Sequence, residues 1–443
     1  MLLLLVSACH DTATPRPATT PLEPVPWSST RSPLEEHSPA GLQWQRGLIH
    51  LHSHYSHDAC DGEPMPGGVP DEACLQHLRD GLCNAGMDFA FITDHPAHAA
   101  EQPYQDLLLN RPGDSVVDGR ANTIPCADHT VLTLPGIEDE LMPIGLKRHV
   151  AEDAASNDAL YNASDDIAIT ALIDAGGLVL QAHTEGQDLD TLYARQAAGQ
   201  AGVEIFNLHA MFDPNKREDD LGLDGLAYLE DLGPFVSGIN GAEPDLAFLT
   251  VHQEQTVSLE RWDALNRVAP SVGVAGTDAH ENVLPSLMSD GERMDSYRRM
   301  MSWFSNIVLV DGDGPEALTG AVAAGRLFLA FESLGTPSGF SVSYAGLEMG
   351  GTAPTGETLS VSCPTLAPTS PTNLDTPEIT VEIFRDSALW QTGCGEYVLS
   401  EPGVYRVRVS IVPWHLRDMM GTVADTLIHS YPWLYSNAFR VGL

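Results

Sequence analysis

Short apolar runs alternate with helical stretches between about Arg46 and Glu332. The apolar runs are nearly continuous, which is typical of strands buried on both faces of a parallel sheet. About seven such units favour a (β/α) barrel, with an open doubly wound sheet as the alternative. The predicted strands are Leu48–His52, Phe89–Thr93, Val131–Ile137, Leu178–Ala182, Val203–Leu208, Val272–Thr277 and Ile307–Val310; the predicted helices are Ala73–Ala85, Ile167–Ala175, Leu189–Ala198, Leu259–Val268, Met294–Phe304 and Pro315–Ala324.

The pattern changes after Glu332. Helical periodicity fades, Gly, Pro, Ser and Thr become frequent, and short alternating runs such as Gly403–Val409 take over. Alternation of apolar and polar residues is typical of strands with one buried face. The sequence therefore predicts a small all-β, immunoglobulin-like sandwich over residues 336–443.

The first residues resemble the end of a bacterial lipoprotein signal peptide. An apolar run over residues 1–8 leads to Cys9, which would be the lipidated residue. A Pro/Thr-rich stretch over residues 10–40 follows and is predicted to be an extended tether. We therefore expect an exported lipoprotein of the cell envelope, in the periplasm or at the outer membrane, that contacts a membrane only through its lipid anchor. A fortuitous apolar start is the alternative.

The remaining six cysteines are an even set, which in an exported protein suggests disulfides. Cys363 and Cys394 both fall in the C-terminal region and can pair there. The other four are expected to pair with one another, in an order that the sequence does not give. A zinc cluster is disfavoured because no CxxC pair is present.

Charge narrows the possible partners. The net charge is −39, which argues against binding to nucleic acids, whose backbones require clustered Lys and Arg. Lys147 and Lys216 are the only lysines, so a polybasic membrane patch is excluded as well. The sequence does not indicate an oligomeric state.

Histidines and carboxylates stand at the ends of nearly all the predicted strands or just beyond them. Functional groups of parallel barrels gather at the C-terminal ends of the strands. Imidazole and carboxylate groups converging there would form a multinuclear metal site. The residues concerned are His50, His52, Asp58, His95, Glu138, His149, His183, His209, Asp278 and His280.

The order of these motifs resembles the PHP (polymerase and histidinol phosphatase) family over residues 41–335. The motifs are His50-x-His52 with Ser56-x-Asp58, Ile92-Thr93-Asp94-His95, Gly136-Ile137-Glu138, Ala182-His183 and Thr277-Asp278-Ala279-His280. The resemblance implies a distorted (β/α)7, TIM-like barrel and two or three divalent metal ions, which could be Zn, Mn or Fe. It also implies phosphoester hydrolysis, although one branch of the family hydrolyses carbamates.

The resemblance further implies how the ligands are shared among the ions. One ion would be held by His50, His52, Glu138 and Asp278. A second would share Glu138 and take His149 and His183, with His129 as the alternative to His149. A third would take Asp58, His95 and His280, with His57 and Asp61 as the alternatives to Asp58.

For the chemistry we expect Glu138, Asp278 and His183 to hold the metals around a bridging hydroxide that acts as the nucleophile. A small anionic phosphoester is the expected substrate. Arg148 is a weak candidate for binding it, as are Arg46, Asn207 and His209. Ser56 is not expected to be a nucleophile and can instead form a hydrogen bond within its loop. The alternatives are a carbamate or amide hydrolase on the same site, and a non-catalytic metal- or ligand-binding envelope lipoprotein.

Overall fold

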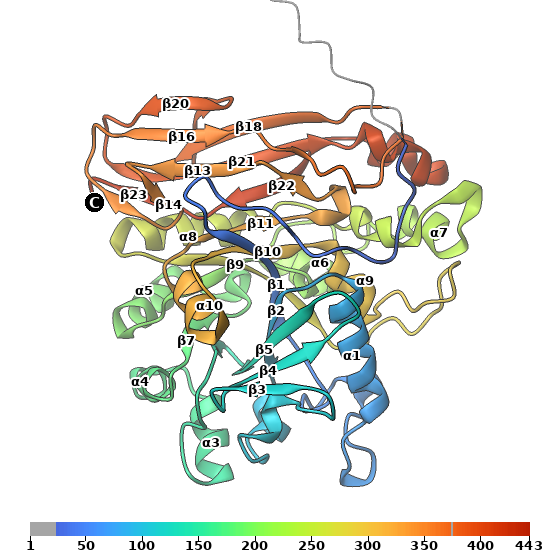
Figure 1. The fold of residues 1–443 in the computed structure, drawn as a ribbon, viewed down its shortest axis with the longest axis vertical. Coiled ribbons are helices and arrows are strands. Elements are labelled where there is room, and N and C mark those ends of the chain that lie inside the picture. The colour runs from blue at the N-terminus through green and yellow to red at the C-terminus, as the bar shows by residue number, and fades with distance from the viewer. Residues whose placement is uncertain (1–23, 374) are drawn as a thin grey trace, which may run out of the picture.

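A closed ring of strands forms the first part of the chain in this computed structural model, which describes residues 24–373 and 375–443 (Figure 1). Each strand is parallel to its neighbours except β6, which is antiparallel to β5 and β7. The ring runs through β1 (Gln43–Leu51), β2 (Phe89–Asp94), β5 (Thr130–Ile137), β6 (Leu141–Ile144), β7 (Leu178–Gln181), β8 (Gly202–Asn207) and β9 (Val272–Ala279), and β9 pairs with β1. The chain is thus a mixed α/β protein with a closed seven-stranded barrel.

The expected (β/α)7 topology is not confirmed in two respects. Strand β6 follows β5 after a turn at residues 138–140, and so short a connection can join only antiparallel strands. The run at 307–310, expected to be a parallel strand, belongs to β10 (Ser305–Val310), which is antiparallel to the first half of β1. The ring therefore closes through β6 instead of β10.

Helices cover the outside of the barrel (Figure 1). Several begin at an aspartate whose side chain accepts hydrogen bonds from the first backbone N–H groups, as Asp71, Asp165 and Asp188 do. The helices are α1 (Glu72–Asn84), α2 (Pro96–Ala99), α3 (Ala154–Tyr161), α4 (Asp166–Asp174), α5 (Leu189–Ala198), α6 (His209–Phe212), α7 (Leu229–Ser237), α8 (Thr256–Val268), α9 (Tyr297–Trp303), α10 (Gly314–Ala323) and α11 (Ala424–Leu427). Within the described ranges, no helix is long and apolar enough to cross a bilayer.

The C-terminal strands extend the barrel sheet and add a second layer. Through β1 the sheet continues into the antiparallel strands β10, β11 (Leu327–Ala330), β22 (Tyr431–Ser436), β21 (Gly403–Val412), β18 (Glu378–Arg385) and β19 (Ala388–Thr392). A four-stranded sheet of β14 (Leu347–Glu348), β13 (Ser341–Tyr344), β16 (Thr358–Ser362) and β20 (Gly395–Val398) lies over it (Figure 1). Because β22 pairs with β11, residues on both sides of the expected 335/336 boundary share one sheet.

Short strands complete the fold. They are β3 (Ser115–Val117), β4 (Ala121–Pro125), β12 (Pro337–Ser338), β15 (Thr352–Ala353), β17 (Thr365–Leu366) and β23 (Phe439–Val441). Apolar side chains from the barrel and from both C-terminal sheets form one continuous core. This core fixes the barrel strands, whose ends carry the site.

The segment expected to be a free tether packs against the protein from residue 24 onward. The Trp27 indole donates a hydrogen bond to Asp245 (3.0 Å), and the Arg31 guanidinium lies 3.6 Å from a Glu332 oxygen. Apolar side chains of this segment, such as Leu34, pack against the core. This packing orders the extended Pro-rich backbone from residue 24 onward. The proposed signal remnant and Cys9 lie outside the described residues.

Three disulfides bridge the described chain. The expected pair Cys363–Cys394 is confirmed. The four cysteines whose order was open pair as Cys60–Cys74 and Cys83–Cys126. The Cys60–Cys74 bridge joins the loop that follows β1 to helix α1, next to the candidate site.

Candidate metal centre

Histidines and carboxylates converge at one end of the barrel, where β1, β2, β5, β7 and β9 finish. Within each of four groups the potential ligand atoms lie within 4.8 Å of one another. The groups share members, so they form one cluster instead of separate sites. They are His52 with His95 and His280, His50 with His52 and Glu138, His50 with His183 and Asp278, and His57 with Asp58 and His95.

The backbone is strained at three of these positions. The φ angles of His50, His183 and Asp278 are 75°, 49° and 52°. They lie in the left-handed region, which residues other than glycine rarely adopt. Such residues cost about 1–3 kcal/mol each and cluster at functional sites. At His50 the pairing of β1 with β9 is interrupted by a register shift between Ile49 and Leu51. His50 and His52 therefore converge through a bulge, and not through the regular strand alternation expected from the sequence.

Glu204 holds the imidazole of His50. Oε1 of Glu204 lies 2.7 Å from Nδ1 of His50, and both side chains are fully buried. A carboxylate accepts a hydrogen bond, so this contact places the proton on Nδ1 and leaves Nε2 as a lone-pair donor. Nε2 of His50 is buried, forms no hydrogen bond within residues 24–373 and 375–443, and lies 3.3 Å from Oδ1 of Asp278.

His52 is oriented in the same way by a different group. Its Nδ1 lies 2.7 Å from Oγ of Ser56, which in turn donates to Asp94 (3.0 Å). Ser56 thus forms hydrogen bonds within its loop, as expected. Nε2 of His52 is again buried without a partner, 3.2 Å from Oδ1 of Asp278. Both histidines of the His-x-His motif therefore direct Nε2 toward the same carboxylate.

Glu138 and Asp278 lie at the centre of the cluster. Nε2 of His183 is 3.4 Å from Glu138 and 3.6 Å from Asp278. Burial alone would raise the pKa of the Glu138 carboxyl, but hydrogen bonds from His183 and His95 hold that pKa far below its usual range. Burial would also raise the pKa of Asp278, but His50, His209 and His52 together lower it well below its usual value. Both carboxylates are therefore ionised and can serve as ligands.

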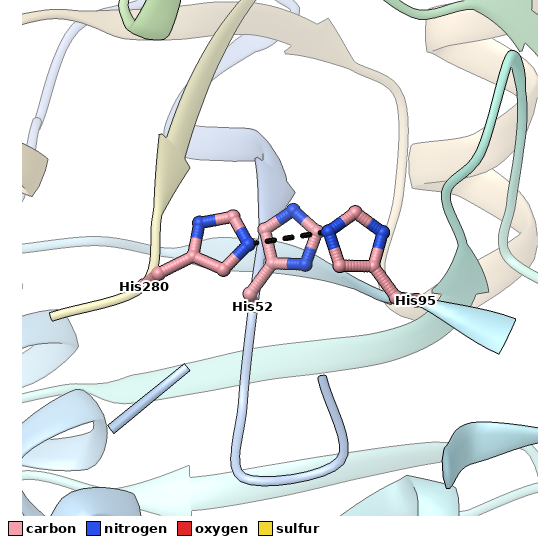
Figure 2. Close-up of side chains that lie close together, drawn as sticks. All are labelled: His52, His95 and His280. Carbon is pink, nitrogen blue, oxygen red and sulfur yellow. Dashed lines mark hydrogen bonds between the residues drawn. The ribbon is translucent and has the colours of Figure 1, made fainter. Parts of the chain in front are cut away.

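Asp58, His95 and His280 form the outer part of the cluster. Figure 2 shows the His52 ring between those of His95 and His280; the rings of His52 and His280 stack at 3.7 Å between centroids. The Nε2 atoms of His95 and His280 are 3.4 Å apart, and Oδ1 of Asp58 lies 3.6 Å and 3.4 Å from them. The three residues proposed for the third ion thus come together.

The donor set fits divalent metal ions. Buried carboxylates need positive charge nearby. Burial lowers the pKa of His50, but Glu204 and Asp278 outweigh it, and the pKa is raised well above its usual value in the metal-free chain. A cation would supply this charge while leaving the Nε2 atoms unprotonated. The mixture of imidazole nitrogens and carboxylate oxygens suits Zn, Mn or Fe.

His149 does not join the cluster, which corrects one predicted ligand. Its Nδ1 lies 2.9 Å from the Tyr161 hydroxyl and its Nε2 lies 2.8 Å from the Gln102 carbonyl, so both ring nitrogens are engaged elsewhere. The loop after β6 carries it away from the strand ends. The alternative His129 pairs with its neighbour Asp128 instead.

Three of the four predicted substrate-binding residues, Arg148, Arg46 and Asn207, form contacts away from the centre. Arg148 is bonded to backbone carbonyls on the surface, and Arg46 is buried in an ion pair with Glu332 (2.8 Å). Asn207 is buried behind the site, where its amide donates to Glu204 (3.0 Å). Only His209 reaches the centre: its Nδ1 is 3.2 Å from Asp278, and half of its side chain is exposed.

Three carboxylates around the centre had no predicted role, although Asp94 belongs to one of the quoted motifs. Glu204 orients His50, Asp94 fixes Ser53 and Ser56, and Glu185 lies 3.4 Å from Nδ1 of His183. Glu204 could have been noticed because it is a charged residue within the apolar run Val203–Leu208. A buried strand carries such a residue only when a partner compensates its charge.

The chain was also compared with known proteins. No protein-family model matches it, and no curated protein sequence does. A crystal structure of a two-domain protein containing a predicted PHP-like metal-dependent phosphoesterase from Bacteroides vulgatus aligns with a TM-score of 0.37 and 10% identity, covering 91% of this chain and 98% of that chain. PsfC from Pseudomonas syringae aligns with a TM-score of 0.30 and 14% identity, covering 61% of this chain and 84% of that one.

Proposed function

We propose that the protein is a metal-dependent hydrolase that cleaves small anionic phosphoesters. The observation that carries this proposal is the pair of buried Nε2 atoms of His50 and His52, which have no hydrogen-bond partner among the residues that the structure describes. An unsatisfied buried nitrogen costs free energy, and two of them facing one carboxylate have no structural purpose that we can identify. Metal binding accounts for both.

The residues would hold two or three ions. His50, His52, Glu138 and Asp278 would hold the first, and Asp58, His95 and His280 the third, as expected from the sequence. For the second we propose Glu138, Asp278 and His183, since His149 lies elsewhere. Bound divalent ions supply Lewis acidity, which lowers the pKa of water and neutralises charge on a phosphoester.

The surrounding side chains position the ligands. Glu204 keeps the Nδ1 proton of His50 in place, and the Ser56–Asp94 pair does the same for His52. His209, half-exposed beside Asp278, is placed to donate a hydrogen bond to a substrate oxygen. Carboxylates that hold histidine ligands in this way strengthen metal binding.

The test is a hydrolysis panel on protein stripped with chelator and reloaded with Zn, Mn or Fe. p-Nitrophenyl phosphate, bis-p-nitrophenyl phosphate and a p-nitrophenyl carbamate are compared. We expect chelator-sensitive turnover of a phosphoester, lost in Glu138→Gln and kept in the surface variant Glu152→Gln. Turnover of the carbamate alone would contradict the assignment as a phosphoesterase. Bound metal without turnover of any substrate would contradict the proposal that the protein is an enzyme.

We also propose that the protein is exported and anchored by a lipid on Cys9. The three disulfides support export, because such bonds persist in oxidising compartments. Mass spectrometry of the membrane fraction of the native host would test the anchor: a diacylglyceryl-modified Cys9 is expected, and an unmodified N-terminus before Cys9 would contradict it.

A further inference from the structure

A cavity of about 280 Å³ opens directly beside the metal centre. Asp58, Asp278, His209 and His280 line its inner side. Most of the other lining residues are apolar: Phe212, Pro214, Val283, Leu284, Met294, Met300 and Trp303. Any ester held at the centre would therefore have one of its substituents next to this apolar surface.

The remaining polar side chains of the cavity are engaged by the protein. Asp213 accepts hydrogen bonds from the backbone N–H groups of Asn215 and Lys216, and the Asn282 amide donates to the Asp58 carbonyl. Asp295 accepts hydrogen bonds from the backbone N–H groups of Val283 and Leu284, and the Arg293 guanidinium contacts it at 2.9 Å. Glu281 is bonded to His77 (2.9 Å). Among the described residues no lysine or arginine lines the cavity. A second phosphate or carboxylate on the substrate would thus find no cationic partner here.

The aromatic walls are held by their own contacts. The Trp303 indole donates to the Asp245 carbonyl (2.8 Å) and stacks on Phe248, with 5.3 Å between ring centroids. The Phe212 ring lies 6.0 Å from Trp303. Met294 and Met300 add thioethers, which make favourable contacts with aromatic rings and adapt to their shape. A fixed aromatic wall with adaptable sulfur atoms suits a planar ring.

We propose that this cavity binds the apolar, preferentially aromatic, substituent of the ester, so that the substrates are aryl phosphoesters; this inference rests on the function proposed above. The size is sufficient, since roughly 150 Å³ of apolar cavity accommodates a benzene ring. Hydrolysis of an aryl monoester would consume one water and release the phenol and inorganic phosphate; an aryl diester would release the phenol and a phosphomonoester. The alcohol side of the substrate is then selected by burial of apolar surface and the phosphate by the metal centre.

Binding of phosphonates tests the inference apart from catalysis, because their C–P bond is not hydrolysed. Dissociation constants of phenylphosphonate and methylphosphonate are measured by calorimetry on metal-loaded protein. We expect the phenyl compound to bind at least about tenfold more tightly, from the area its ring buries. Val283→Asp should reduce this ratio at least threefold. Leu287→Asp is the matched control: it is in the same loop and equally exposed but outside the cavity, and it should keep the ratio.

Equal affinity of the parent protein for the two phosphonates would overturn the inference and leave the proposed function standing. An equal loss of preference in Val283→Asp and Leu287→Asp would also overturn it. A retained phenyl preference in a protein that hydrolyses no ester would support the cavity assignment while contradicting the proposed function.

Discussion

Oε1 of Glu204 and Nδ1 of His50 lie 2.7 Å apart in the fully buried interior of the barrel. Glu204 also accepts a hydrogen bond from the backbone N–H of His183 (2.8 Å), so one carboxylate orients parts of the site on two strands. Removing a side chain that hydrogen-bonds a metal-binding histidine typically lowers metal affinity 10–100-fold. We expect Glu204→Gln to lower metal affinity by about this factor in a competition titration with a chelator. Glu316→Gln, on the surface, is the control; equal affinities would contradict the role of Glu204.

Gly276 leaves the space that this pair occupies. A Cβ atom at this position would overlap Oε1 of Glu204 and come within 3.1 Å of Nδ1 of His50. Gly276→Ala should therefore displace the carboxylate, weaken metal binding and lower the free energy of unfolding by about 1–3 kcal/mol. Chemical denaturation checks the stability loss. In the double variant with Glu204→Ala the clash disappears, so the two losses should be less than additive; strict additivity would refute the steric explanation.

The Cys60–Cys74 disulfide anchors the loop that carries Asp58. The backbone N–H of Cys60 donates to the His280 carbonyl (3.0 Å), which keeps Asp58 close to the His280 ring. The double variant Cys60→Ser/Cys74→Ser should lose about 2–4 kcal/mol of stability. It should also have a lower affinity for the ion held by Asp58, His95 and His280. Metal analysis after reloading checks this. Cys363→Ser/Cys394→Ser should lose stability but keep its full metal content; if both variants lose metal alike, the loop is not the cause.

Two buried histidines outside the site should make the protein sensitive to acid. Burial lowers the pKa of His252 to about 3 and that of His415 to about 4. Each Nε2 faces a backbone carbonyl, and each Nδ1 is buried with no hydrogen-bond partner in the described part of the chain. The folded-state pKa values lie below the unfolded value of about 6.5, so the stabilisation is present above pH 6.5 and is lost as the pH falls toward 3–4. Between pH 8 and pH 5 each histidine should account for about 2 kcal/mol.

Urea unfolding at the two pH values measures this effect. His252→Gln and His415→Gln should each flatten the pH dependence by about that amount, whereas the exposed His37→Gln should leave it unchanged. An unchanged pH dependence in both buried variants would show that these histidines are not the acid-sensitive groups.

Most of the regular elements could be predicted because their patterns were local. The helix expected at Leu189–Ala198 has these bounds, and the apolar runs at Phe89–Thr93 and Val131–Ile137 are strands. Strand β6 was missed because it is short and contains Pro143. The predicted direction of β10 was wrong because an apolar run does not reveal which neighbouring strand it pairs with. Pairing depends on the chain that joins the strands and on the rest of the sheet.

The site could be predicted where a ligand directly ends a strand. His50, His52, Glu138, His183 and Asp278 converge, since β1, β5, β7 and β9 all finish at the same end of the barrel. The prediction of His149 as a metal ligand was wrong because this residue lies in a long loop, and spacing in the sequence does not fix the course of such a loop. Glu204 was missed because its partner is 154 residues away in the chain. The bulge at His50 could not be expected from a motif that fits a regular strand equally well.

The most direct test of the metal centre is the number of ions per chain in the reloaded protein, measured by elemental analysis for the parent and for Glu138→Ala and His149→Ala. The account predicts at least two ions in the parent, the same number in His149→Ala, and the loss of two ions in Glu138→Ala, because Glu138 is shared between them. A parent without bound ions, or a Glu138→Ala variant with the full number, would contradict it.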